Sequence, residues 1–426
     1  MLNKFREFWN NQSRNWKVIM ARNSIGTLFT GGGEAGGGPM AMEAAAGGGQ
    51  YWTVFMDRLG LSTVEIGLLR SISSAVNVLF AVPSGWLTDR AKKMKRLYLI
   101  GRAVALPVAL IRFLATAWPF CVLISVWETV SLRIMMPPSQ IIAIDSLSNE
   151  DRVTGLSINR TMMGIAGTIG PLITALIINY FGGLDLADSI RPLFLIQFVV
   201  GLFIMALLIT QMQEVTFTRE KDSGIFSHLF DVFKEVPILK LLLFRQCAMM
   251  FFMSIGMPFL TLYMVDIKGA DEFILGWRGT FMTATTVCLS IPIGRVADKI
   301  GRRRVAYFGR VFGWAGLLIM ILTPPTHPEY LIIAGVLESF RMITFVGWQA
   351  FDQELVPLEG RGRYSGVTMM MNGMVGVVAP ILGGFLWEID PDYLWWIRIL
   401  GGAFMILPLM IIIGYKASKT ENITSS

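Results

Sequence analysis

The chain has few of the residues from which zinc sites, disulfide frameworks and soluble surfaces are built. Its 426 residues include three cysteines and two histidines, and only 16% of them are charged. His228 and His327 are too few for a Cys/His zinc site. Cys121, Cys247 and Cys288 lie in apolar runs, which excludes a disulfide-stapled secreted fold. Since an average soluble domain carries about 25% charged residues, we expect most of the chain to lie in lipid.

The sequence also has no phosphate-binding loop. A P-loop needs Gly-x4-Gly-Lys-Ser/Thr, and the chain contains no Gly-Lys dipeptide. Gly31, Gly33 and Gly36 match the dinucleotide pattern, but they lie in a glycine-rich tract with no strand before it. A polytopic membrane enzyme would need His, Asp or Cys clustered at one membrane face. We therefore expect no cofactor, no metal, no ATP-driven transport by this chain alone and no enzymatic activity.

Long apolar runs dominate the sequence instead. Hydrophobic residues make up 54% of the chain, and its mean hydropathy is +0.57. A membrane-spanning helix needs about 20 mostly apolar residues. Runs of that size predict twelve spans, near residues 17–57 (interrupted), 63–87, 97–117, 119–144, 157–180, 191–210, 238–263, 273–294, 305–322, 330–350, 364–387 and 393–414. We therefore expect an all-α integral membrane protein whose main partner is the lipid bilayer.

Basic residues gather in the loops on one side of these spans. They lie in seven short segments, 4–17, 90–96, 152–160, 219–240, 295–304, 361–363 and 416–419. The loops on the other side hold Arg58, Arg191 and Lys268. The positive-inside rule then predicts that both termini are cytoplasmic, in a plasma or inner membrane. Because this charge is spread along the flanks of the spans, we expect no nucleic-acid partner.

The chain repeats itself. The segment GWLTDRAKKMKR begins at Gly85, and GRVADKIGRRR begins at Gly294. The same spacing relates Gly164, Gly167, Gly170 and Pro171 to Gly373, Gly376, Ala379 and Pro380. Repeats with an even number of spans keep the same orientation, so they are parallel repeats. The expected domains are two six-helix bundles, residues 1–210 and 238–426, joined by a cytoplasmic linker at 211–237.

These two segments carry a family resemblance. Gly85, Leu87, Asp89 and Arg90, and in the second half Gly294, Ala297, Asp298, Lys299, Gly301, Arg302 and Arg303, resemble the loop 2–3 signature of the major facilitator superfamily. The resemblance implies twelve transmembrane helices in two parallel-repeat bundles around a central cavity. It also implies secondary transport of a small solute by alternating access.

The resemblance further implies a conformational latch on the cytoplasmic side. Asp89 would face the positive end of the eleventh helix, and Arg90 would bridge to Asp145. Asp298 and Lys299 would act in the same way against the fifth helix. The whole expected latch comprises Gly85, Asp89, Arg90, Asp145, Gly294, Asp298, Lys299 and Arg302. The alternative is that these charges only set the topology and solvate a turn.

The small residues of the fifth span allow two interpretations. Gly164, Gly167 and Gly170, followed by Pro171, resemble the Gly-Pro element of family antiporters. Small residues on one face also let helices approach closely, and a proline bends a helix. The first interpretation favours export, whereas the second concerns helix packing alone.

One segment does not suit a lipid-facing helix. Residues 31–49 are rich in glycine and also contain Glu34, Pro39 and Glu43. Without residues 31–46 the first span would have about 25 residues, a normal length. We therefore predict an insertion at 31–46. The alternative is a native unwound backbone that lines the cavity.

Charges inside the spans are the best indication of a site, because each is costly unless it is paired or faces water. The substrate or coupling candidates are Asn77, Arg112, Glu128, Arg133, Arg245, Glu338 and Arg341. Arg112 and Glu128 lie at similar depths on consecutive spans, so they are expected to pair. Glu338 and Arg341 are spaced i, i+3 and share one helix face. Structural pairing and a role in transport stay open for each candidate.

The sequence favours export of an amphipathic compound, because the helices expected to form the cavity are rich in methionine and phenylalanine. Its partners would be a small-molecule substrate and, where transport is coupled, protons or another ion. The alternatives are import of a polar metabolite and a polytopic receptor that transports nothing.

Overall fold

The fold is helical throughout the part of the chain that the structure describes. This is a computed structural model that describes residues 9, 12–30, 48–147, 152–215, 233, 236, 238–357 and 360–424, and these residues contain no strand. The candidate insertion at 31–46 and nearly all of the expected linker lie outside the described residues. The chain divides into two compact units. The domain boundaries expected from the repeat stay a prediction.

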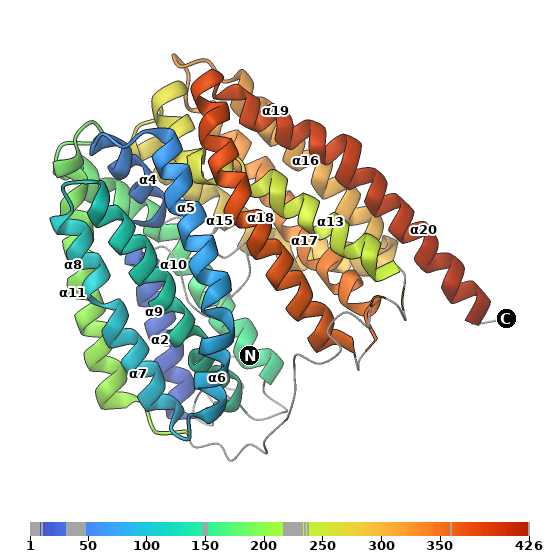
Figure 1. Ribbon diagram of the computed structural model, residues 1–426, viewed down its shortest axis with the longest axis horizontal. Coiled ribbons are helices and arrows are strands. Elements are labelled where there is room, and N and C mark those ends of the chain that lie inside the picture. Colours follow the sequence, from blue (N-terminus) through green and yellow to red (C-terminus); the bar gives the residue numbers. More distant parts are fainter. Residues whose placement is uncertain are drawn as a thin grey trace. The chain divides into compact units, whose positions relative to one another are not determined.

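Unit 1 comprises Met1–Gly60, Leu79–Arg219 and Asp271–Ala284. Its core includes Tyr98, Met135 and Ile204, which pack between helices from different parts of the unit. In Figure 1, α7 and α9 run side by side. The helices of unit 1 are α2 (Arg14–Thr30), α4 (Gly48–Arg58), α6 (Ala81–Arg90), α7 (Met94–Ala105), α8 (Pro107–Leu114), α9 (Trp118–Asp145), α10 (Arg152–Tyr180) and α11 (Ala187–Gln211).

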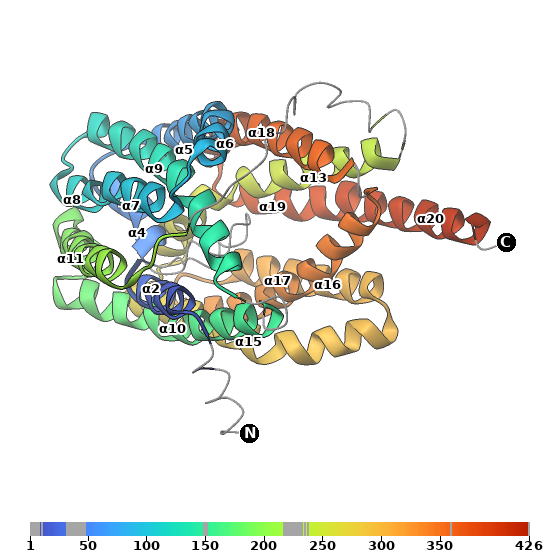
Figure 2. The same cartoon turned by 90° about the horizontal axis from the view of Figure 1, so that it is seen from below.

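Unit 2 comprises Leu61–Val78, Glu220–Ala270 and Thr285–Ser426. Its core includes Leu242, Trp348 and Met410. Figure 2 shows α16 beside α17. The helices of unit 2 are α5 (Thr63–Leu79), α13 (Ile238–Ser254), η1 (Met257–Phe259), α14 (Leu260–Leu262), η2 (Tyr263–Ile267), α16 (Arg302–Leu322), α17 (Tyr330–Glu354), α18 (Arg361–Ile389), α19 (Asp392–Gly401), η4 (Gly402–Ile406) and α20 (Leu407–Thr424).

The helix α15 (Glu272–Ile300) contributes to both units, and its first half packs in unit 1. The Thr280 hydroxyl donates to the Thr168 carbonyl on α10 at 2.7 Å. A Cβ on Gly276 would lie 3.0 Å from the Cβ of Ala175. The first half of α15 therefore lies directly against α10 within unit 1. In the same way, most of α5 packs within unit 2, where the Gly384 backbone approaches Val64.

Prolines break several helices that the sequence predicts as continuous. The predicted span 63–87 is two helices, because α5 ends at Leu79 and the chain bends by 44° before the second helix. Pro83 has no N–H for the Leu79 carbonyl, and its ring crowds that carbonyl. Pro107 opens α8 in the same way, after α7 ends. Pro258 follows the end of α13, where the span continues as short 3-10, α and π segments to Ile267.

Nine helices of the described chain are long and apolar enough to cross a membrane, or ten when the bent pair of α5 and α6 counts as one span. The set is consistent with twelve spans, because α17 is also 25 residues long, and α2 and α4 lie on either side of residues 31–47. The chain is therefore a multi-pass membrane protein.

The two halves of the chain use the same helix contact. A Cβ on Gly101 of α7 would lie 3.0 Å from Met135 on α9. In the second half, a Cβ on Gly309 of α16 would be crowded still more closely by Thr344 on α17. An arginine follows each of these glycines in the sequence. The spacing between Arg102 and Arg310, 208 residues, is one less than the 209 residues between Gly85 and Gly294, so the two arginines lie at similar points of the two halves.

Candidate functional site

Unit 2 contains a cavity of about 50 Å³ that lies between its helices. A buried water needs roughly 10–15 Å³ on this measure, so the cavity has room for a small polar group. Its wall combines methionines, aromatic rings and arginines. The lining residues are Met249, Phe252 and Met253 from α13, Ala306, Arg310, Trp314 and Leu317 from α16, Arg341, Thr344, Phe345 and Trp348 from α17, and Arg398, Gly402, Ile406 and Met410 from the last span.

The last span is irregular where it meets this cavity. Residues Gly402–Ile406 form a π-helix between α19 and α20, and both ends of this segment line the cavity. A Cβ on Gly402 would lie 2.7 Å from Nε1 of Trp314, so glycine is what lets the indole approach the helix. Single π-turns inside helices are found frequently at functional sites. The irregular backbone therefore supports a functional role for the cavity.

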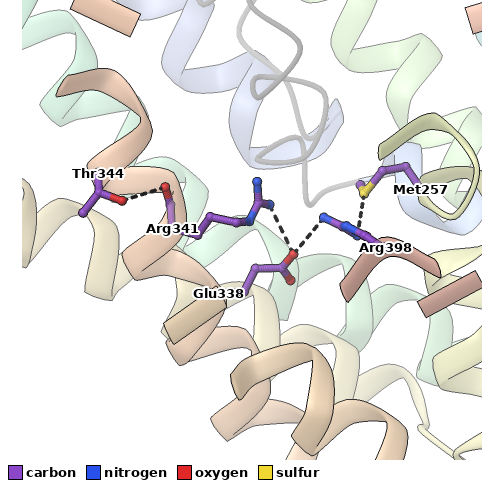
Figure 3. A network of polar contacts seen from close by, with 5 residues as sticks. All are labelled: Met257, Glu338, Arg341, Thr344 and Arg398. Atoms are coloured by element: carbon purple, nitrogen blue, oxygen red, sulfur yellow. Dashed lines mark hydrogen bonds and ion pairs between the residues drawn. The ribbon is translucent and has the colours of Figure 1, made fainter. Parts of the chain in front are cut away.

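A charge cluster, drawn in Figure 3, includes two of the residues that line the cavity, Arg341 and Arg398. Oε1 of Glu338 accepts from Nη2 of Arg341 at 3.3 Å and from Nη2 of Arg398 at 3.4 Å. The side chains of Glu338 and Arg398 are 8% and 7% exposed, so this contact is almost fully buried. The second guanidinium nitrogen of Arg398 lies 3.5 Å from the sulfur of Met257. The structure thus confirms the i, i+3 pair that the sequence predicts and adds a second arginine to it.

Arg310 brings a third guanidinium to the cavity wall from α16. Its Nη2 lies 3.7 Å from the sulfur of Met249. It is close enough to Arg245, Arg341 and Asp352 for electrostatic interaction with each of them. Its counterpart in unit 1, Arg102, likewise contacts a methionine sulfur, at 3.9 Å.

Arg245 forms a buried ion pair with Asp352, which joins α13 to α17. The two side chains are 1% and 6% exposed. Gln246 lies 3.5 Å from the same carboxylate oxygen, and the Arg245 guanidinium lies 5.5 Å from the centre of the Trp348 ring. Nε and Nη1 of Arg245 have no hydrogen-bond partner among the described residues. Of the sequence candidates, Arg245 is therefore the most deeply buried charge.

Unit 1 contains the ion pair that the sequence predicts between α8 and α9. Nη2 of Arg112 lies 2.7 Å from Oε2 of Glu128. The guanidinium of Arg112 also lies 4.8 Å from the centre of the Trp52 ring and 6.0 Å from that of Phe194. Aromatic faces attract a cation at such distances. In this structure Arg112 and Glu128 therefore form an ion pair between α8 and α9.

A second polar cluster of unit 1 joins α2 to α10. Arg22 donates to Oδ1 of Asn23 at 2.5 Å, and Nδ2 of Asn23 lies 3.3 Å from Oδ1 of Asn159. All three side chains are buried. Arg22 also lines a smaller cavity of about 10 Å³, together with Tyr98 and Ser139. The sequence analysis did not select these residues.

The charged residues of the expected latch lie at helix ends, whereas Gly85 and Gly294 lie inside α6 and α15. Asp89 and Arg90 end α6 and are exposed, and the Arg90 guanidinium lies 4.1 Å from the centre of the Trp86 ring. A Cβ on Gly85 or Gly294 would meet no atom within 4 Å. Gly301 precedes α16 with a φ of +98°, a conformation in which glycine is favoured. The other members lie at the ends of α9, α15 and α16, and they are Asp145, Asp298, Lys299 and Arg302.

The remaining candidates, Asn77 and Arg133, are half-buried on α5 and α9. Neither is a lining residue of the cavity in unit 2. The roles of the candidates and of the latch stay predictions. Among the described residues, no group of three His, Cys, Asp or Glu side chains lies close enough to hold a metal ion.

The sequence analysis missed three charged residues of this region. Arg398 and Arg310 are near enough to helix ends to resemble interfacial anchors, and Asp352 lies two positions before the end of α17. A signal for Arg310 did exist, because the Gly-Arg dipeptide occurs once in the third span of each half. No comparable local pattern marks Arg398, whose partner Glu338 is 60 residues away in the chain.

Comparisons with known proteins agree with the helical architecture and the internal repeat. The sequence model of the Major Facilitator Superfamily matches the chain twice, at residues 40–257 and 242–425. An uncharacterized MFS-type transporter of Methanocaldococcus jannaschii is 24% identical over 348 residues, which are 78% of this chain and 82% of that protein. An uncharacterized transporter of Buchnera aphidicola is 27% identical over 164 residues, which are 37% of this chain and 40% of that protein.

Solved structures show the same fold. A point mutant of the nucleoside transporter NupG has a TM-score of 0.73 at 13% identity, over 93% of this chain and 98% of that chain. A bacterial homologue of the human lysosomal transporter Spinster, in an inward-facing and unoccupied conformation, has a TM-score of 0.58 at 13% identity, over 95% of this chain and 94% of that chain. With a family match that covers most of its length and an all-α multi-pass fold, the chain belongs to the major facilitator superfamily of transporters.

Proposed function

We propose that this transporter exports a small amphipathic solute by alternating access, from a plasma or inner membrane in which both termini are cytoplasmic. The observation that carries the proposal is the cavity of unit 2, whose wall places methionines and aromatic rings next to arginine side chains. Ligand sites are mostly apolar with a few placed polar groups. Such a wall suits a solute with an apolar body and a polar end.

The wall also explains why a range of apolar shapes would fit. Met249 and Met253 of α13 and Met410 of α20 line the cavity. Methionine is unbranched and polarizable, so it adapts to irregular partners. Trp314 and Trp348 add large flat surfaces.

The direction of transport rests on the Gly-Pro element of α10, which resembles that of family antiporters. Membrane orientation rests on the positive-inside rule. Lys92 and Lys93 lie in the exposed turn between α6 and α7, and Arg304 is exposed at the start of α16. A basic turn of this kind occurs at the equivalent point of each half of the chain.

The test is flux in proteoliposomes that contain the purified chain. Vesicles are loaded with a radiolabelled amphipathic compound, and its release is compared with that from protein-free vesicles. Release that saturates with solute concentration supports the proposal. A matched variant is Trp314→Ala, which removes one aromatic wall of the cavity and is expected to lower the rate.

The same vesicles test the two alternatives. Saturable uptake of a polar solute such as a nucleoside, without release of amphipathic compounds, would contradict export and favour an importer. Binding of a solute with no flux in either direction would instead favour a receptor.

A further inference from the structure

We propose that the cavity of unit 2 binds the acidic group of an organic anion, through Arg310, Arg341 and Arg398. Glu338 is then an internal carboxylate that competes with the solute for two of these guanidinium groups. The inference rests on the proposed function, because it names the class of solute that the same cavity takes. The proposed interaction is the binding of a carboxylate or sulfonate group by arginine side chains.

The first argument is charge. The helices that form the cavity carry four arginines away from their first turns, and these are Arg245, Arg310, Arg341 and Arg398. The same part of these helices carries two buried carboxylates, Glu338 and Asp352. Asp352 is held by Arg245. The arginine side chains of this region thus exceed its carboxylates by two, which favours an anionic ligand over a cationic one.

The second argument is position. Arg310, Arg341 and Arg398 are cavity-lining residues, whereas Glu338 is not. These arginines come from three different spans, so their charged ends converge on one space. Arginine is suited to this role because its planar group binds a carboxylate through two parallel hydrogen bonds.

The third argument is the geometry of the Glu338 contacts. One oxygen, Oε1, receives both guanidinium groups, at 3.3 and 3.4 Å. These distances are long for charge-assisted hydrogen bonds, which usually measure about 2.7–2.9 Å. A solute carboxylate inside the cavity would reach the same two arginines from the other side. Long contacts to Glu338 make such an exchange of partners cheaper than it would be from a tight bidentate pair.

The fourth argument is size. A volume of about 50 Å³ suits a carboxylate or sulfonate but not a whole amphipathic molecule. The cavity is therefore the subsite for the acidic end of the solute, and the aromatic and methionine side chains contact the first part of its apolar body. This arrangement explains why arginines and apolar side chains share one wall.

The test measures protection of a thiol inside the cavity by small probes of different charge. The full chain carries Thr344→Cys on a background in which the three native cysteines are replaced by alanine, and it is reconstituted in lipid nanodiscs. The rate of reaction with N-ethylmaleimide is measured with benzoate, benzamide or benzylamine at equal concentrations. We expect benzoate to slow the reaction at a concentration at least about tenfold lower than benzamide does, because charged hydrogen bonds are the stronger ones. Benzylamine should give no protection.

The variant Glu338→Gln tests whether Glu338 competes with the solute, because the proposal predicts the direction in which protection by benzoate changes. Removal of the competing carboxylate should lower the concentration of benzoate that halves the reaction rate, whereas a purely structural Glu338 would leave it unchanged or raise it. The matched control is Glu354→Gln, the same change on an exposed residue at the end of the same helix.

Arg398→Gln should abolish the preference for benzoate, and Arg398→Lys should keep part of it because the charge remains. If Glu338→Gln does not fold, the neutral pair Glu338→Gln with Arg398→Gln removes both charges, and it should fold and bind benzoate no better than benzamide.

Equal protection by benzoate and benzamide, or protection by neither, would overturn the inference. The flux assay separates this failure from failure of the proposed function. Export of neutral amphipathic compounds without benzoate protection would leave the transporter proposal standing and remove the anion site. Benzoate protection without flux of any amphipathic compound would leave the anion site standing and remove the proposed function.

Discussion

Arg398 and Glu338 meet in the interior of unit 2 at 3.4 Å, although 60 residues separate them in the chain. The contact links the last span to α17, and Arg341 reaches the same oxygen from within α17. A second pair, Arg245 and Asp352, links α13 to α17. The helix α17 thus supplies the carboxylate in both buried pairs, and the cost of burying those charges falls when the pairs form.

The pair of Arg245 and Asp352 is expected to be structural. Asp352→Leu should destabilise the protein by ~3–5 kcal/mol, because it leaves a buried arginine without its counter-charge. The double variant Arg245→Leu with Asp352→Leu should recover most of this loss, because an apolar pair of similar volume is often as stable as an ion pair. Unfolding in detergent, followed by helicity, measures both effects.

Glu354→Leu is the control for this comparison, since Glu354 is exposed on the same helix and should change stability by less than about 0.5 kcal/mol. If the double variant transports normally, Arg245 has no direct part in transport. A double variant as unstable as the single one would refute the structural assignment.

The sequence predicted the local features of the fold and of its charges. Twelve spans and two halves follow from apolar runs and from the segments at Gly85 and Gly294. Pairs within one helix or between consecutive helices, such as Arg112 with Glu128, also follow from spacing. The contact of Glu338 with Arg398 could not be predicted from spacing, because it depends on how helices that are distant in the chain pack together. The helix breaks near Pro83 and Pro258 were missed because the apolar runs continue through them.

The close contact of α10 with α15 gives a test of alternating access. The Cβ of Ala175 lies 3.0 Å from the position of a Cβ on Gly276, and a disulfide joins Cβ atoms about 3.5–4.5 Å apart. Ala175→Cys with Gly276→Cys, in a background without other cysteines, should therefore cross-link on oxidation. The helix α10 belongs to the first expected bundle and α15 to the second, and alternating access requires the two bundles to move against each other. The cross-link should therefore stop flux, and a reductant should restore it. The single variant Ala175→Cys under the same oxidation is the control, and full flux in cross-linked protein would contradict the expectation.

Asp89 is predicted to hold the cytoplasmic side closed through the positive end of a helix. Such a contact contributes ~0.3–1 kcal/mol when exposed and up to ~2 kcal/mol when partly buried. Asp89→Asn should therefore shift the conformational equilibrium several-fold toward the form that is open to the cytoplasm. Spin labels attached at Lys92→Cys and Arg304→Cys should then show longer distances. Asp188→Asn, the same change on an exposed residue of α11, should leave them unchanged. Identical distance distributions in both variants would reduce Asp89 to a topology residue.

The membrane orientation can be tested with residues whose exposure is known. Lys268, one of the few basic residues on the expected outer side, is buried, and its Nζ donates to the Ile321 carbonyl at 2.6 Å near the end of α16. A helix C-terminus favours a cation, which accounts for this lysine. Exposed Thr326 is therefore a better labelling site. A membrane-impermeant maleimide should label Thr326→Cys from outside intact cells and Lys92→Cys only after the membrane is opened. Labelling of both from the same side would refute the topology.

The anion proposal predicts that the membrane potential drives export. Moving one elementary charge across 100 mV is worth ~2.3 kcal/mol, which corresponds to a concentration ratio of about 50-fold. A potential that is negative inside pushes an anion outward, so an anion that moves without a proton needs no other energy source to leave. Proteoliposomes loaded with 2-naphthalenesulfonate, which stays ionised, should lose it faster when potassium efflux through valinomycin makes the inside negative. Reversing the potential should slow the loss, and a pH gradient alone should have little effect. Arg398→Gln is the matched variant, and it should lose the response together with the flux. Flux that follows the pH gradient and ignores the potential would mean that a proton travels with the anion, in which case the inward proton gradient would favour uptake and the proposed direction of transport would be wrong.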